Sequence, residues 1–127
     1  MQNKISDSEF ATFERIDGII YGTYKPNVAL DIKVAEITKK QYLDFIEKSE
    51  ELLISDGRNL TGISKEAREF YGGEMGVKGV KACALINNSF VTKTIINLFL
   101  KINKPAVPTK MFSDVNEAAK WLKELTF

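Results

Sequence analysis

The stretch VKACALIN, residues 80–87, is the clearest indication of the architecture of this chain. It is an almost continuous apolar run of strand length, and such runs are typical of central parallel strands that are buried on both faces. Residues 89–102 follow at once with a helical pattern, which the Lys-Pro pair at 104–105 ends. A buried strand that leads directly into a helix predicts a βα unit of a parallel sheet.

Towards the carboxyl end, the short run TKMF (109–112) predicts a further strand. A last helix begins at Asp114, and Glu117 lies three residues further on, in the spacing of a capping box. The apolar stripe of this helix consists of Ala118, Trp121, Leu122 and Leu125.

Towards the amino end, ELLISD (51–56) predicts another apolar strand, and residues 64–71 predict a helix. We expect the glycines at 72 and 73 to end that helix as a C′ glycine does. The stretch GGEMGVKG (72–79) has the glycine content of a phosphate-binding loop, but it follows a helix and precedes a strand. A nucleotide-binding loop has the opposite context, so these residues predict a flexible connection.

The chain begins with a hairpin signal. The runs FATFERI (10–16) and IIYGTY (19–24) are rich in β-branched and aromatic residues, and an Asp-Gly pair at 17–18 separates them. Such a pair supplies the positive φ angles of a type I′ turn. From Asp31, a plausible N-cap, apolar residues recur at helical spacing to about residue 48.

The predicted order is therefore a hairpin followed by helix, strand, helix, strand, helix, strand and helix. Strands that alternate with helices of this length imply right-handed βαβ crossovers. We expect an α/β fold with a mostly parallel sheet backed by helices. Because 127 residues leave no room for a second core, we expect residues 1–127 to form a single domain.

Composition argues against several classes of function. The net charge of +1 gives no electrostatic reason to bind nucleic acid. No apolar run approaches the roughly 18 residues of a membrane span, and the first ten residues lack the apolar core of a signal peptide. A single cysteine excludes an internal disulfide and favours a reducing, cytoplasmic location.

The chain contains no histidine, the commonest general base and the commonest metal ligand. Cys83 alone cannot form a thiolate cluster, so we expect no metal and no cofactor. Cys83 lies in the middle of an apolar strand, where free cysteine behaves as a small buried hydrophobe. We therefore expect a protein that is not an enzyme and has no catalytic residues.

Three stretches together resemble a known family: VKGVKACALINNSF (77–90), NLFLKINKPAVPTKMFSDVNEAAKWL (97–122) and ISKEAREFY (63–71). The chain is similar to the SpoIIAA-like, or STAS, fold, and in particular to small bacterial proteins of that class without an assigned activity. The resemblance implies a regulatory domain that works through protein–protein interaction.

In STAS antagonists of anti-sigma factors, a serine in the first turn of the helix after this strand is phosphorylated, typically within Asp-Ser-Ser-Gly-Leu. The nearest match by position is Ser64, and Thr61 is the second choice. This chain reads Gly-Ile-Ser-Lys-Glu at residues 62–66, so the motif itself is absent. The alternative is a plain N-cap, because serine is among the best capping residues.

A polar cluster of Asp56, Arg58 and Asn59 follows the strand at 51–56. Ligands of open α/β sheets bind at the carboxyl ends of strands, so the cluster is a candidate polar site. The same residues are ordinary turn residues, and the turn is the preferred interpretation.

The helix FVTKTIINLFLKI (90–102) has more apolar surface than a surface helix needs. At about 100° per residue, one apolar stripe predicts the core face. Ile96 and Leu100 fall on the far side, with Phe99 between the two. This second stripe is either covered by the chain's own terminal segments or exposed as a contact for a partner or a lipid. The residues of the predicted core face are Val91, Ile95, Leu98 and Ile102.

Two functions remain open on this basis. The first is a non-catalytic binding domain that recognises an unknown protein partner and forms a homo-oligomer. The second is binding of an apolar small molecule or lipid between helix and sheet, lined by the helix at 90–102.

Overall fold

The computed structural model describes residues 4–102 and 104–127, and it confirms the predicted order of elements. One helix, α3, and three strands, β1, β4 and β6, were not predicted, and each of them is a short segment of three or four residues. In chain order the elements are β1 (Ile5–Asp7), β2 (Ala11–Ile16), β3 (Ile19–Tyr24), β4 (Val28–Leu30), α1 (Ile32–Phe45), β5 (Glu51–Asp56), β6 (Leu60–Ile63), α2 (Lys65–Gly72), α3 (Glu74–Val77), β7 (Val80–Ile86), α4 (Phe90–Ile102), β8 (Thr109–Phe112) and α5 (Val115–Glu124).

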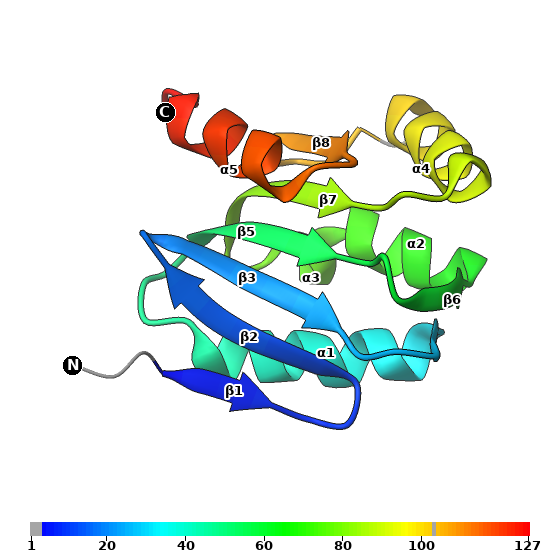
Figure 1. Cartoon of the computed structure of the whole chain (residues 1–127), viewed down its shortest axis with the longest axis horizontal. Coiled ribbons are helices and arrows are strands. Elements are labelled where there is room, and N and C mark those ends of the chain that lie inside the picture. Colours follow the sequence, from blue (N-terminus) through cyan, green and yellow to red (C-terminus); the bar gives the residue numbers. More distant parts are fainter. Residues whose placement is uncertain (1–3, 103) are drawn as a thin grey trace.

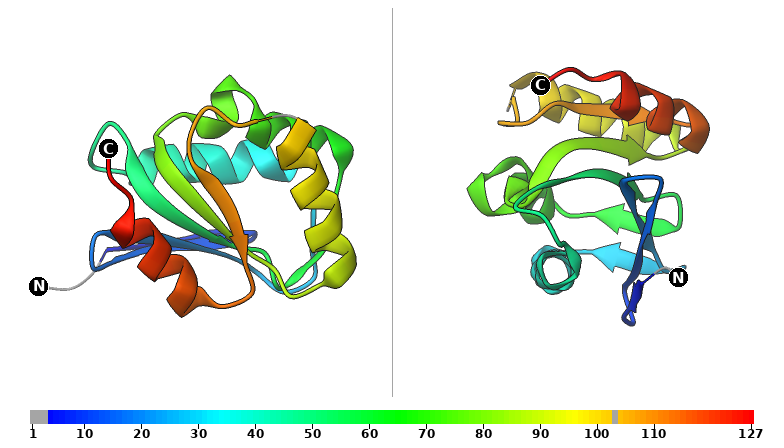
Figure 2. Two further views of the ribbon diagram at one scale, coloured as in Figure 1. Left: turned by 90° about the horizontal axis from the view of Figure 1, so that it is seen from above. Right: turned by 90° about the vertical axis from the view of Figure 1, so that its left-hand side faces the viewer.

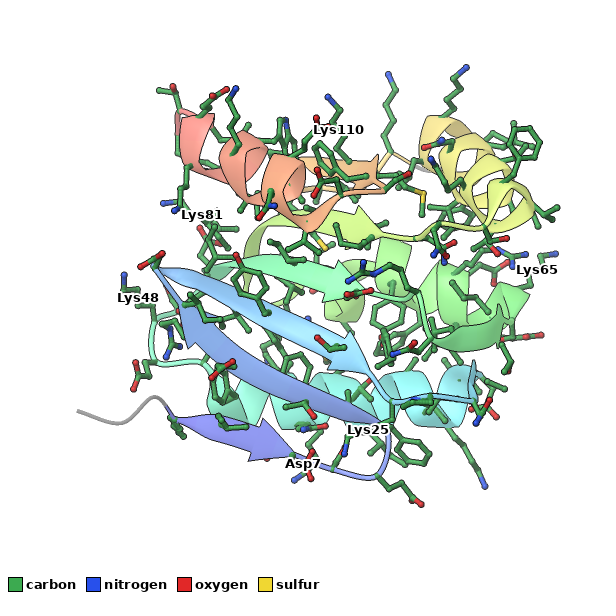
Figure 3. The ribbon with its side chains drawn as sticks, viewed as in Figure 1. Asp7, Lys25, Lys48, Lys65, Lys81 and Lys110 are labelled. Carbon is green, nitrogen blue, oxygen red and sulfur yellow. The ribbon has the colours of Figure 1, made fainter. Side chains whose placement is uncertain are left out.

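The predicted hairpin is formed by β2 and β3. Asp17 and Gly18 have φ angles of 52° and 80°, both in the left-handed region that a type I′ turn requires. The register pairs Ile16 with Ile19 next to the turn. At the other end of the hairpin, Lys25 and Asp7 lie side by side (Figure 3), with Nζ 2.8 Å from Oδ1.

The main sheet has the strand order β1-β2-β3-β5-β7-β8. The three amino-terminal strands are antiparallel, and β3, β5, β7 and β8 are parallel to one another (Figure 1). One face of the sheet carries α5, and the opposite face carries α1, α2 and α3 (Figure 2). Helix α4 lies near the carboxyl ends of the parallel strands, where α/β proteins usually bind ligands.

The helices begin at the predicted caps. The Asp31 carboxylate accepts a hydrogen bond from the backbone N–H of Val34 at 2.9 Å, and this fixes the first turn of α1. Asp114 caps α5 in the same way by accepting from the N–H of Asn116 at 2.9 Å.

The glycine-rich stretch differs from the prediction. Gly73 has a φ of −92°, so it ends α2 in an extended conformation and not as a left-handed C′ glycine. The next residues form α3, one helical turn, in place of a flexible connection. A Cβ on Gly76 would lie 2.1 Å from the carbonyl oxygen of Phe70, so only glycine lets α3 fold back so closely on α2.

Strands β4 and β6 form a separate two-stranded parallel sheet. Each is only three or four residues long, and neither shows an alternating pattern that would predict it. The N–H of Ser64 donates to the carbonyl of Leu30 at 2.9 Å and joins this small sheet to the start of α2.

Candidate functional site

An apolar cavity of about 160 Å³ lies between the sheet and the helices α1, α2 and α4. Leu53, Cys83 and Leu85 contribute to its sheet wall, and Leu60 and Ile63 of β6 border it. An engineered cavity of roughly 150 Å³ with apolar walls binds benzene in another protein. The volume therefore suits one small ring or a short chain, and a full-length acyl chain needs more room.

The cavity explains why β7 is not buried on both faces. Ala82, Ala84 and Ile86 are fully buried under α5, whereas Cys83 and Leu85 are only half-buried. The two half-buried side chains point towards α1 and α4, where the cavity leaves part of their surface uncovered. Cys83 thus lies in the apolar interior as predicted, but it borders a hollow.

Helix α4 covers the cavity with the residues of the second apolar stripe. Ile96, Phe99 and Leu100 are half-buried and line it. A Cβ on Gly72 would lie 3.1 Å from the Phe99 ring, so this glycine gives the ring its place against α2. None of the residues of α4 is buried, so the helix closes the cavity without filling it.

The predicted core face of α4 is wrong. Its four side chains are exposed, with exposed fractions of 43% for Ile95 to 72% for Ile102. The pattern separates the two stripes correctly. However, the stripe predicted to face the core is exposed, and the other stripe faces the cavity. Because both stripes are apolar, the pattern alone does not distinguish the face that meets the rest of the chain. We use the name α4 seam for the exposed set, which consists of Val91, Ile95, Leu98 and Ile102.

A chain of hydroxyl groups lies in the wall of the cavity. Thr38 Oγ1 donates to the carbonyl of Val34 at 2.9 Å, so its only hydrogen is used. The Tyr71 hydroxyl, 3.0 Å from Thr38 Oγ1, must then donate to it, and the Tyr24 hydroxyl donates to Tyr71 at 2.9 Å. Burial raises the pKa of Tyr24 well above its ordinary value and also raises the pKa of Tyr71. All three groups stay neutral at physiological pH.

Lys39 of α1 also lines the cavity, and it is only 5% exposed. Its Nζ donates to the carbonyl of Gly76 at 2.9 Å and lies 4.9 Å from the centroid of the Tyr42 ring. Burial lowers the pKa of Lys39 to about 8, and burial raises the pKa of the nearby Cys83 thiol to about 12. At neutral pH the cavity thus holds a largely protonated amine and an unreactive, protonated thiol.

The predicted polar cluster at Asp56 forms a closed turn. The carboxylate of Asp56 accepts from the backbone N–H of Arg58 at 3.1 Å and pairs with its guanidinium at 2.6 Å. Asn59 donates to the carbonyl of Tyr24 at 3.2 Å. These contacts match the turn interpretation, and none of the three residues lines the cavity.

The two candidate phosphorylation sites lie apart from the cavity as well. Ser64 Oγ accepts from the N–H of Ala67 at 3.1 Å and caps α2. Thr61 is exposed on β6, and its hydroxyl donates to the carbonyl of Val28 at 3.4 Å. The geometry of Ser64 is that of the plain N-cap.

Lys39 and the hydroxyl chain are the polar features that sequence reasoning missed. The signal for Lys39 was present: it lies four residues after Ala35 and three before Tyr42, on the stripe that α1 buries. A lysine at such a position is unusual, because lysine is almost never fully buried without a partner. Tyr24 and Tyr71 carried no comparable signal, since aromatic residues are common in any core.

Comparison with known proteins places the chain in a family. Residues 13–126 match the model of a family described as a domain of unknown function, DUF7793, and the chain belongs to that family. No curated protein matches it.

Two solved structures are similar to the chain. The first is an uncharacterised protein of the DUF3478 family with a SpoIIAA-like fold from Shewanella loihica PV-4, at 20% identity, 96% coverage of each chain and a TM-score of 0.60. It shows that the chain has a SpoIIAA-like fold, as predicted. The second, a protein of unknown function from Arthrobacter sp. FB24, is 26% identical over 86% of this chain and 95% of its own, with a TM-score of only 0.32. Within residues 4–102 and 104–127, no helix has the length and apolar character needed to cross a membrane.

Proposed function

We propose that this protein is a non-catalytic binding domain whose cavity holds an apolar molecule of about the size of benzene. The observation that carries the proposal is the cavity of about 160 Å³ between the sheet and α4. Its size narrows the lipid alternative to small rings and short chains. The absence of histidine and the protonated state of Cys83 support a role without chemistry.

Benzene itself is a suitable probe of this proposal. Backbone amides labelled with ¹⁵N are followed by NMR as benzene is added, and we expect saturable shifts in β5, β7 and α4 but not in α5. Cys83→Leu adds apolar volume inside the cavity and should abolish these shifts. Leu98→Lys, on the opposite face of α4, should leave them intact. If the wild-type amides do not shift, or if they shift equally in Cys83→Leu, the proposal is wrong.

The α4 seam favours a second, compatible function, which is recognition of a partner protein. Its residues follow one another at intervals of four, three and four, the spacing of an a/d seam that packs against another helix. At about 100° per residue they span only about 60° of arc, which is narrower than the apolar face of an interfacial membrane helix. We infer that the seam receives an amphipathic helix of a partner protein.

The charges around the seam indicate the chemistry of that partner. Between Asn87 and Ser113 the chain has four lysines and no aspartate or glutamate. Lys101 lies on α4 next to Ile102 of the seam, Lys104 follows the helix, and both are exposed. A second copy of the chain would bring like charges together, whereas an acidic helix complements them. The proposed partner therefore has acidic residues flanking an apolar stripe.

A synthetic peptide with leucine at the a and d positions and glutamate at e and g tests this second function. Glutamates at e and g repel one another, so the peptide does not self-associate readily. We expect it to bind the wild type and Cys83→Leu, but not Leu98→Lys. Vesicles of anionic phosphatidylglycerol and the size of the protein on gel filtration test the alternatives. If the protein binds the vesicles but not the peptide, the seam recognises a membrane. If the wild type is a dimer that Leu98→Lys dissociates, the seam binds a second copy of the chain. Either outcome contradicts the partner helix.

The two functions share α4. Its inner side chains line the cavity, and its outer side chains form the seam. A ligand that shifts α4 by its contacts with Ile96 or Leu100 would therefore also shift the seam. This arrangement supports a STAS-like regulatory role, in which a small molecule changes the affinity for a protein partner.

A further inference from the structure

Lys39 is a buried cation without a counter-ion. Among the ion pairs of residues 4–102 and 104–127, none includes this side chain. An ammonium group has three hydrogens to donate, and the one hydrogen bond of Lys39 goes to the carbonyl of Gly76. Burying a charge in this way is costly unless a partner compensates it. The compensating group is therefore expected from outside the chain.

The cavity offers an anion few other donors. Thr38, Tyr71 and Tyr24 spend their hydroxyl hydrogens on the backbone and on one another, so they present lone pairs to a ligand. The side-chain amide of Asn87 donates to the carbonyl of Gly57 at 3.3 Å. One further cation borders the cavity: Arg68 of α2, which is half-buried and donates to the carbonyl of Ile63 at 2.8 Å.

We infer that the cavity takes a small apolar carboxylate, whose carboxylate group accepts hydrogen bonds from the Lys39 ammonium while its ring or short chain occupies the apolar space. This inference rests on the proposed ligand-binding function and names the chemical class of the ligand. Lys39 is preferred over Arg68 because it is more deeply buried; among the described residues, neither cation forms an ion pair with a carboxylate. A charge-assisted hydrogen bond in a site of this kind is stronger than a neutral one.

The energetics favour an anion that arrives after folding. The desolvation of Lys39 is already part of the folded state, so the ligand incurs only the cost of its own desolvation. The titratable or charged groups that face the amine are Cys83 of β7, Lys78 after α3 and Tyr42 of α1. None of them supplies a negative charge at neutral pH. The pKa of Lys39 is lowered to about 8, as expected for an amine that is buried without a neighbouring anion.

Three probes and three proteins test the inference. Benzoate and benzamide have the same shape but differ in charge, and benzene reports on the cavity alone. We expect the wild type to prefer benzoate over benzamide by about tenfold or more, as for a hydrogen bond to a charged group. Lys39→Met should lose this preference and still bind benzene. Arg68→Met is the control that removes the other cation at the cavity, and it should keep the preference for benzoate over benzamide.

The outcomes separate the inference from the proposed function. If benzene binds the wild type but benzoate has no advantage over benzamide, the inference fails and the cavity function stands. The inference also fails if Lys39→Met keeps the preference, or if Arg68→Met alone abolishes it. If none of the three probes binds, both are wrong.

A second measurement does not depend on a variant that folds. The Lys39 amine of the wild type is titrated by NMR with and without ligand. Benzoate should raise the pKa of Lys39 from about 8, because a nearby anion favours the charged amine. Benzamide should leave it unchanged. An unchanged pKa with saturating benzoate would place the anion elsewhere and overturn the inference.

Discussion

The two faces of the sheet are built from the same strands but differ in packing: the face under α5 is filled, whereas the opposite face is filled under α1 and hollow at the cavity. Under α5, the buried residues of the core are at most 1% exposed. On the other face, Leu53, Cys83 and Leu85 are half-buried and line the cavity, and α4 contributes no buried residue. The fully buried set under α5 consists of Ile19, Ile54, Ala82, Ala84, Ile86, Ala118 and Leu122.

The difference shows how one strand can serve stability and binding together. Ala82 and Ala84 of β7 meet Ala118 of α5, and these small side chains allow close packing of helix and sheet. Their neighbours on the same strand, Cys83 and Leu85, point into the cavity. We therefore assign the α5 face to stability, and we propose that the cavity face carries function.

The largest effect is expected on the filled face. Leu122→Ala removes a buried side chain of the α5 core and should lower the free energy of unfolding by about 2–5 kcal/mol. Leu85→Ala is the matched change on the cavity face and should cost less, since this side chain already borders empty space. Urea denaturation measures both. Equal losses would show that the two faces are packed alike.

A second pair of variants tests the same difference by enlarging, and not truncating, two neighbouring side chains of β7. Ala84→Leu overpacks the α5 face and should cost about 1–3 kcal/mol. Cys83→Leu places the larger side chain in the cavity, and its free energy of unfolding should stay the same or rise. Thermal unfolding of both variants decides the matter. A destabilised Cys83→Leu beside a tolerated Ala84→Leu would reverse the assignment of filled and hollow faces.

A smaller effect should appear as a change with pH. The pKa of Lys39 is about 8 in the folded state, below the ordinary value of 10.5, because burial disfavours the charged amine. Between these two values the unfolded chain binds more protons than the folded one, so the free energy of unfolding should rise with pH in that range. Below pH 8 both states are protonated and the slope from Lys39 vanishes.

Lys39→Met provides the control for this dependence. The variant lacks the amine, so the difference from the wild type isolates its contribution while all other groups titrate alike in both proteins. We expect Lys39→Met to be the more stable protein at pH 7 and its advantage to shrink by pH 10, measured by urea denaturation. A constant difference across this range would show that Lys39 is not desolvated.

The sequence predicts most of the fold because the long elements carry periodic patterns and caps. The hairpin turn at Asp17, the cap at Asp31 and the apolar strand at 80–86 each depend on local chemistry, and each is confirmed. Strands β4 and β6 escape prediction, because their pairing is a contact between two loops and leaves no periodic trace.

The site is harder to predict for two physical reasons. A cavity is the absence of atoms between elements, and no pattern within one element records it. The orientation of α4 depends on which apolar stripe finds a complementary surface, and Phe99 against Gly72 is a contact between residues 27 positions apart. Lys39 is the exception, since a lysine within an apolar stripe can be noticed in the sequence.

The smallest expected effect concerns the two sides of α4, where Ile95 and Ile96 are adjacent in sequence but differ in surroundings. Ile95 belongs to the exposed seam, and Ile95→Lys should change the free energy of unfolding by no more than about 0.5 kcal/mol. Ile96→Lys places an ammonium group at the apolar cavity and should cost about 1–3 kcal/mol. Because helix propensity and charge change equally in both variants, the difference between their urea midpoints reports on burial alone. If Ile95→Lys lowered the free energy of unfolding more than Ile96→Lys, the seam would be the buried side of α4. The side chains of the seam, and not Ile96, would then face the cavity.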